Sequence, residues 1–205
     1  MRKISIFDFA YFLELLIRFS ASCINLFLSA MIIVALPYLI TEVLPFSAVQ
    51  ANKLYGYAQG ALAAGGIAGG IGAGILTDRL QINKAGNLLI IGSICIFPMG
   101  LSLWWSHSSM VIYCTITTCC FVIMSISTVF SVQIMAFVQT QTPQNLIGKV
   151  MAVLMTGAMC AQPFGNAMYG LLFEICAGHE AAVVFFAGMV SLLIAYKKRK
   201  VFLAL

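Results

Sequence analysis

A long apolar stretch without any charged side chain constrains this sequence most strongly. Between Lys53 and Asp78 the only ionisable groups are tyrosines, and glycine and alanine fill most of the run. As a helix, these roughly 24 residues are about 36 Å long, enough to cross a bilayer core of about 30 Å. Glycine weakens a helix in water, but in lipid the backbone must still close its own hydrogen bonds. The stretch is therefore predicted to be a membrane-spanning helix.

Glycines recur along this stretch at helical spacing. Gly66, Gly70 and Gly74 are four residues apart, and Gly65 and Gly69 repeat the spacing one position earlier. Residues four apart lie on one face of a helix. A glycine face forms a groove into which the backbone of another helix can press. We therefore predict helix packing at Gly66, Gly70 and Gly74, and also at Pro163 and Gly165 of a later span.

The composition extends the membrane prediction to the whole chain. Of the 205 residues, 62% are hydrophobic and only 8% are charged, whereas soluble domains carry about 25% charged residues. This balance predicts an all-α integral membrane protein with the lipid bilayer as a partner. The net charge of +5 does not indicate nucleic-acid binding, because the basic residues lie at the ends of apolar runs.

Apolar runs separated by polar segments predict a six-helix transmembrane domain at residues 19–200. The predicted spans are 19–44, 54–77, 86–105, 110–137, 149–173 and 181–196. Residues 1–18 are predicted to be an interfacial lead-in helix, and residues 201–205 a C-terminal tail. In this arrangement every lysine and arginine except Lys53 falls on the side of the two termini. The positive-inside rule therefore places both termini in the cytoplasm, and we expect a multi-pass protein of the cell (plasma) membrane.

Prolines are expected to distort two of these spans. Pro37 should kink the first span near its end, and Pro163 with Gly165 should break the fifth. The broken fifth span and the glycine-rich second span are each the second helix of a three-helix set. Transporters built from inverted three-helix repeats have such paired, interrupted helices near the transport pathway. The sequence therefore predicts a bundle of two inverted three-helix repeats.

Amide side chains inside the predicted spans are candidates for lining a substrate pathway. They are Asn25, Gln59, Gln133, Gln162 and Asn166. An amide in lipid needs partners, so it faces protein or water. Hydrogen bonding between helices would explain them equally well, and both interpretations stay open. Some span hydroxyls are expected to bond their own helix backbone, namely those of Thr117, Thr118, Ser125 and Thr128.

Chemistry of other kinds is not indicated. The seven cysteines lie in or at the edge of apolar runs and are expected to be lipid- or helix-facing thiols. Neither a CxxC pair nor a Cys/His cluster has zinc spacing, so no metal or cofactor is expected. An H-E-x-x-H motif and a buried pair of acids are also missing, so we expect no enzyme. Glu42, Glu174 and Glu180 lie near span ends, and His107 and His179 in loops, where we expect the histidines to face solvent.

Two segments resemble motifs of a known transporter family. Gly74-Ile75-Leu76-Thr77-Asp78-Arg79 resembles the G-x-L-a-D-R loop of the major facilitator superfamily. Residues 142–151 resemble its P-x-x-x-x-G-[RK]-V stretch before the eleventh helix. The run 25–44 is similar to the seventh helix of the macrolide-efflux-like branch. The resemblance covers nearly the whole chain, as the C-terminal half of such a transporter. After Arg79 the family's glycine and adjacent basic residues are missing, and Lys84 is the only base.

This resemblance implies a secondary active transporter that exports small amphipathic compounds, macrolides among them, by alternating access. It also implies a set of gating-loop residues, which are Gly74, Asp78, Arg79, Lys84, Gly148 and Lys149. Alternatively, Asp78 and Arg79 only end a helix and compensate its dipole. The partner would be a missing N-terminal six-helix half. The alternatives are a self-associating carrier made of two copies of this chain, and a non-functional truncated transporter fragment.

Overall fold

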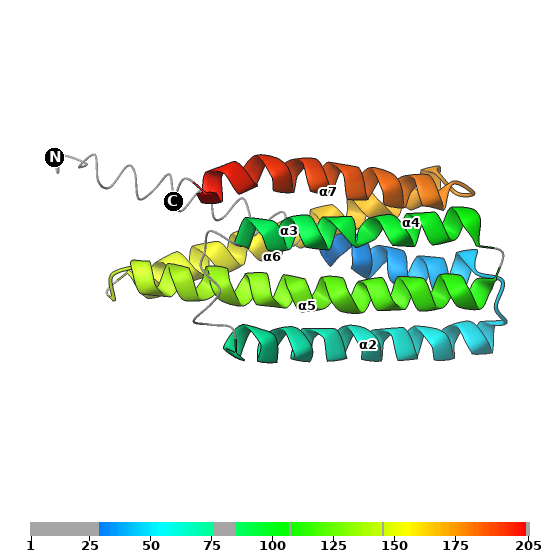
Figure 1. The fold of residues 1–205 in the computed structure, drawn as a ribbon, viewed down its shortest axis with the longest axis horizontal. Coiled ribbons are helices and arrows are strands. Elements are labelled where there is room, and N and C mark those ends of the chain that lie inside the picture. Colours follow the sequence, from blue (N-terminus) through cyan, green and yellow to red (C-terminus); the bar gives the residue numbers. More distant parts are fainter. Residues whose placement is uncertain (1–28, 76–84, 107, 145, 204–205) are drawn as a thin grey trace.

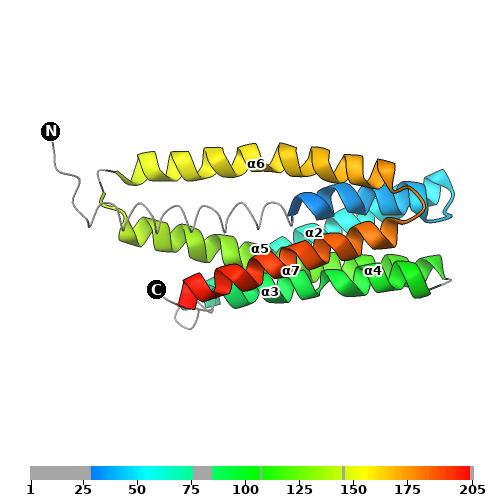
Figure 2. The same cartoon turned by 90° about the horizontal axis from the view of Figure 1, so that it is seen from above.

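Every element in the described part of the chain is a helix. The computed structural model describes residues 29–75, 85–106, 108–144 and 146–203. Its helices are Ser29–Val43, which ends in the π-helix η1 (Leu39–Val43), α2 (Ala48–Ile75), α3 (Ala85–Ile94), α4 (Ile96–Trp105), α5 (Ser109–Gln141), α6 (Ile147–Ile175) and α7 (Glu180–Leu203). They lie side by side, with their long axes roughly aligned (Figures 1 and 2).

These helices confirm the predicted all-helical class. Five helical segments are long and apolar enough to cross a membrane, with α3 and α4 together forming one of them, and Ser29–Val43 is a shorter apolar helix. Each of the six predicted spans therefore contains an apolar helix. The tail predicted at 201–205 belongs to α7 as far as Leu203. The lead-in helix predicted at 1–18 lies outside the described residues.

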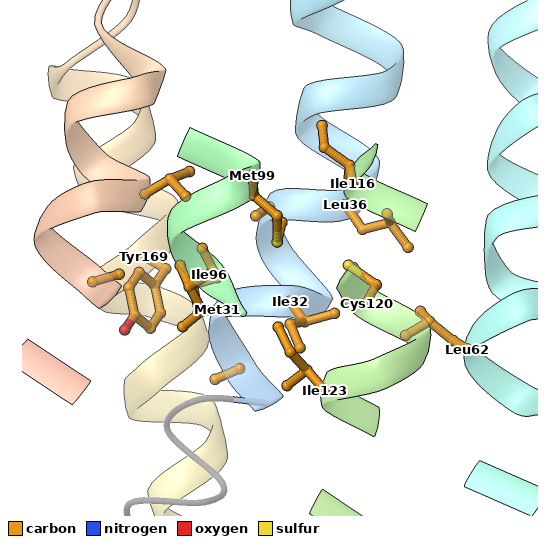
Figure 3. Packing of buried hydrophobic residues seen from close by; sticks show 14 of the residues in the cluster. Met31, Ile32, Leu36, Leu62, Ile96, Met99, Ile116, Cys120, Ile123 and Tyr169 are labelled. Atoms are coloured by element: carbon orange, nitrogen blue, oxygen red, sulfur yellow. The ribbon is translucent and has the colours of Figure 1, made fainter. Parts of the chain in front are cut away.

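The first described helix, Ser29–Val43, forms the centre of the bundle. Its side chains are buried on two adjoining faces: Met31, Ile32, Ala35, Leu36, Leu39 and Ile40 are each at most 1% exposed. Figure 3 shows Met31, Ile32 and Leu36 among side chains from α4 and α5. Contact on several sides makes this helix the common packing partner of the others.

Two prolines change the helix in which they lie. Proline has no N–H, and its ring clashes with the carbonyl four residues earlier. After Pro37 the chain widens into η1, where the Leu44 N–H donates to the Leu39 carbonyl at 3.0 Å. Pro98 faces the carbonyl of Ile94, and here the third span divides into α3 and α4 at Cys95. The predicted distortion at Pro37 is therefore confirmed, and the division ahead of Pro98 was not predicted.

The predicted break in the fifth span is wrong. The helix α6 runs without interruption from Ile147 to Ile175 and contains Pro163. Transmembrane helices tolerate proline, because local adjustments of the neighbouring turns restore the freed backbone groups. Pro163 is exposed on α6, whereas Gly165, two residues later, is buried.

The closest contact between two helices joins α2 to α5. A Cβ atom at Gly65 would lie 2.6 Å from the Phe121 carbonyl oxygen, and one at Gly69 would overlap the Ser125 backbone. Only glycine allows two backbones to approach so closely. The Ser125 hydroxyl also lies 2.9 Å from the carbonyl oxygens of both Gly65 and Phe121, and its single proton is shared between these two acceptors. The contact therefore combines close backbone packing with a hydrogen bond between helices.

Of the glycine series predicted to pack, Gly66 lies at the edge of this contact, and Gly70 and Gly74 lie outside it. One residue is about 100° around a helix. A Cβ atom at Gly70 or Gly74 would meet no described atom within 4 Å, and one at Gly66 would lie 3.9 Å from the Thr128 hydroxyl. Within the described chain the neighbouring series, Gly65 and Gly69, makes the contact instead. Packing of Gly66, Gly70 and Gly74 against a second protein stays a prediction.

A second seam of small residues joins α4 to α7. A Cβ atom at Gly100 would lie 3.1 Å from the Phe185 ring, and one at Gly188 would lie 3.3 Å from Ile96. These glycines let the ring of Phe185 and the side chain of Ile96 lie flat against the opposite backbone. The seam therefore fixes where Phe185 lies at one end of the bundle.

We expect Gly69→Ala to destabilise the α2–α5 contact by about 1–3 kcal/mol, because the added methyl group forces two backbones apart. Gly70→Ala is the matched control, since a Cβ atom there meets nothing. The measurement is the thermal midpoint of the purified chain, followed by size-exclusion chromatography after heating. Equal midpoints for the two variants would contradict the packing described here.

Candidate functional site

The structure places the predicted pathway amides in different environments. Gln59 is exposed on α2, and its Nε2 donates to the Tyr55 hydroxyl one turn away at 2.7 Å. Gln133 on α5 and Asn166 on α6 are half-buried. Both amide atoms of Gln133, and Oδ1 of Asn166, are buried without a hydrogen-bond partner among the described residues. Gln162 is half-buried one turn before Asn166 on α6, and Asn25 lies outside the described residues.

Gln133 lies near the end of the bundle where α2 finishes and α3 begins. Two turns earlier on α5, Ile126 lies 3.8 Å from the position of a Cβ atom at Gly92 of α3. Positions seven residues apart share a helix face. Gln133 therefore belongs to the face of α5 that is turned toward the first turns of α3. A buried amide in that position calls for a partner, because an unpaired amide costs free energy.

Hydroxyl groups follow the sequence prediction only in part. Ser125 and Thr128 donate to carbonyl groups of their own helix at 2.9 Å, as predicted. The Thr117 hydroxyl is buried without a partner among the described residues, so the prediction for Thr117 is wrong. Sequence reasoning missed the pair formed by Ser29 and Ser127, whose Oγ atoms are 3.4 Å apart. No spacing rule connects residues so far apart in the chain.

The predicted gating residues are described only in part. Gly74 is exposed in the last turn of α2, and Gly148 and Lys149 are exposed in the first turn of α6. These two turns lie at the same end of the bundle (Figure 1). Asp78, Arg79 and Lys84 lie outside the described residues, so the predicted charge relay stays a prediction.

The opposite end, which we call the tryptophan end, carries a pocket that sequence reasoning did not predict. Its volume is about 400 Å³. The lining comes from the end of η1, the end of α4 and the start of α7, and consists of Val43, Leu103, Trp104, Gly178, His179, Glu180, Ala181, Ala182 and Phe185. The pocket is mostly apolar, with one carboxylate and one imidazole at its rim.

Aromatic contacts and a tight turn hold the pocket in shape. The rings of Trp104 and Phe185 meet edge to face, with centroids 6.4 Å apart, and Phe97 lies 6.1 Å from Phe185. Gly178 adopts a φ of 88°, a left-handed conformation that favours glycine. The Gly178 N–H donates to Oε1 of Glu180 at 2.7 Å. The carboxylate is therefore fixed by the turn that precedes α7.

The residues of this pocket were visible in the sequence only as separate features. His179 is exposed, as predicted, and Glu180 lies at a span end. Tryptophan is a residue type that collects at membrane–water interfaces, but sequence spacing alone could not place Trp104 in the same pocket as Glu180 of another helix. The seam between α4 and α7 does this in the fold.

The described part of the chain offers no metal site. It contains no group of three His, Cys, Asp or Glu side chains able to hold a metal ion. Six described cysteines are free thiols, as predicted. Taken together, the described helices define a multi-pass, α-helical membrane protein. No family model, curated protein or solved structure matches the chain.

We expect Gln133→Leu to keep or raise the thermal midpoint, because leaving a buried amide unpaired costs about 1–3 kcal/mol. Ser125→Ala serves as a contrast, since it removes the hydrogen bond to Gly65 and should lower the midpoint. The measurement is thermal unfolding of the purified chain in detergent. A lower midpoint for Gln133→Leu would reveal a partner for this amide outside the described residues.

Proposed function

We propose that this chain is the C-terminal half of a secondary transporter of the major facilitator type. In this proposal it pairs with an N-terminal six-helix half in the plasma membrane, with both termini in the cytoplasm. Two bundles rocking about a central site would export small amphipathic compounds by alternating access. The resemblance of residues 74–79 and 142–151 supports the family, and the similarity of residues 25–44 to the macrolide-efflux-like branch supports the class of substrate.

The observation that carries the proposal is the exposure of α6. Only 6% of the most apolar window of α6 is buried, against 28% for both α2 and α5 and more for the other spans. In a chain of two three-helix sets, α2 and α6 are the second helices of each set. A half-transporter leaves the faces of two equivalent helices open for the other half. The open glycine face of α2 supports an interface with another half, because a groove lined by glycines packs well against a helix backbone but makes few contacts with lipid chains.

Polar groups on α6 support the same proposal. Gln162 and Asn166 lie one turn apart, and Oδ1 of Asn166 has no partner among the described residues. Amides within a membrane span face protein or a water-filled path. Both amides lie on the same side of α6 as the buried Tyr169, so a water-filled path inside the proposed transporter would satisfy them.

The α4–α7 seam is also compatible with two repeated units. It joins the third helix of the first set to the third helix of the second. In an inverted repeat, equivalent helices meet across the pseudo-two-fold axis. Glycines lie on both sides of the seam, with Gly100 against Phe185 and Gly188 against Ile96.

The functional test begins with the DNA upstream of Met1 and with co-expression of any six-helix protein encoded there. In cells without their own efflux pumps, we expect the pair to lower the accumulation of a fluorescent amphipathic dye, and each half alone to leave it unchanged. Transport by this chain alone would replace the proposal with a self-associating carrier. Unchanged accumulation with both halves present at the membrane would reject transport of this substrate class.

We expect Gly70→Leu to reduce co-purification of the two halves several-fold, because leucine fills the open glycine face of α2. Gly72→Leu is the matched control, since Gly72 lies on the opposite side of α2 and a Cβ atom there meets no described atom. The measurement is the amount of partner half recovered with the tagged chain in mild detergent. Equal recovery with both variants would exclude this face from the interface.

A further inference from the structure

The pocket at the tryptophan end carries a negative charge that no described lysine or arginine neutralises. The Glu180 carboxylate forms no ion pair with a described residue, and its one described hydrogen bond comes from the Gly178 backbone. Glu42 adds a second negative charge nearby, since both carboxylates act electrostatically on Tyr38. Among the described residues of this end, Lys53 is the one lysine or arginine and does not line the pocket, whereas His179 lines it without a described ion pair. The pocket therefore favours a cation.

The aromatic rings of the pocket restrict which cation fits. An ammonium group is attracted to the faces of tryptophan and phenylalanine rings within about 6 Å. Trp104 and Phe185 both line the pocket, and Gly100 holds the Phe185 ring against α4. An ammonium group bound here would contact the Glu180 carboxylate and an aromatic ring together. A bare metal ion would lack the set of oxygen ligands that it requires.

The start of α7 offers a complementary place for an anion. The N–H groups of the first turn of a helix have no acceptor four residues earlier in the helix, and they attract phosphate. The N–H groups of His179 and Ala182 already donate to the carbonyls of Cys176 and His179, which leaves those of Glu180 and Ala181 for a ligand. Glu180 and Ala181 line the same pocket as Trp104. The pocket thus presents a carboxylate with aromatic rings for a cation, and helix N–H groups for an anion. A zwitterion matches both.

An apolar surface continues from the pocket along the bundle. Leu101 on α4, one turn from Trp104, is 54% exposed, and Phe186 and Met189 on α7 are each 60% exposed. Trp104 and Trp105 are of the residue type that collects at the level of lipid headgroups. Acyl chains can lie along this surface while a headgroup occupies the pocket.

We propose that this pocket binds the headgroup of a zwitterionic phospholipid, with ethanolamine or choline as its cation. The ammonium group lies between Glu180 and the ring of Trp104, and the phosphate lies at the start of α7. The site is separate from the substrate path of the proposed transporter, and its test does not depend on transport.

The test is native mass spectrometry of the purified full chain with added lipid. Phosphatidylethanolamine is compared with phosphatidylglycerol of the same acyl chains, which has no ammonium group. We expect the wild-type chain to retain phosphatidylethanolamine preferentially. Glu180→Gln keeps an acceptor for the Gly178 N–H and removes only the charge, so the preference should fall about tenfold, as for loss of one charge-assisted contact. Trp104→Leu should weaken it by a similar factor.

Two matched controls lie at the same end of the molecule. Trp105→Leu removes an indole that is 82% exposed, against 78% for Trp104, but that does not line the pocket. Glu174→Gln removes an exposed carboxylate outside the pocket. Both should keep the wild-type preference. Equal retention of the two lipids by the wild-type chain, or equal losses in controls and pocket variants, would overturn the proposal.

A final experiment distinguishes binding of a lipid from binding of a free organic cation. Benzyltrimethylammonium presents the ammonium group without phosphate or acyl chains. If it binds the wild-type chain in a Glu180-dependent manner while phosphatidylethanolamine is not retained, the lipid assignment is wrong. If it fails to displace retained phosphatidylethanolamine at equal concentration, the phosphate and acyl contacts contribute as proposed.

Discussion

The backbone contact between α2 and α5 at Gly65 and Gly69 determines the orientation of the glycine-rich helix. In lipid, helices gain little from leaving an apolar solvent, so close packing and hydrogen bonds hold them together. A side chain at either glycine would overlap the α5 backbone, and the Ser125 hydroxyl adds a hydrogen bond to Gly65. This contact sets the rotation of α2 about its own axis. Gly70 and Gly74 face outward as a result.

Small residues also allow close helix packing on the other side of the bundle. Gly100 and Gly188 bring α4 against α7, and the division ahead of Pro98 separates α4 from α3. The position of Phe185 over Gly100 then sets one wall of the pocket beside Trp104. The glycine contacts between α4 and α7 thus place aromatic rings and Glu180 together at the tryptophan end. Substitutions at Gly100 would therefore change the shape of the pocket as well as the packing of α4 against α7.

Sequence reasoning succeeded where one property of a segment decides its structure. Charge-free length and helical glycine spacing were enough to predict the helices and a close contact on α2. It did not distinguish which of two glycine series meets α5, because Gly65 and Gly66 differ only by the rotation that tertiary packing selects. The predicted break at Pro163 was wrong for a similar reason, because the effect of a proline on a membrane helix depends on how the neighbouring turns adjust. The pocket was missed because its walls come from helices distant in sequence.

The two sides of α6 differ in how they are packed. This 29-residue apolar helix is held mainly through the stripe of Gly165, Tyr169 and Phe173, and the ring centroids of Phe173 and Tyr38 are 5.2 Å apart. Its opposite side leaves Phe164 exposed, whereas Gln162 and Asn166 are half-buried on the same side as the stripe, seven residues before Tyr169 and Phe173. Lipid can cover the phenylalanine, but it cannot satisfy an amide. The amides of α6 therefore need polar partners on its packed side, whereas its exposed side needs only an apolar neighbour.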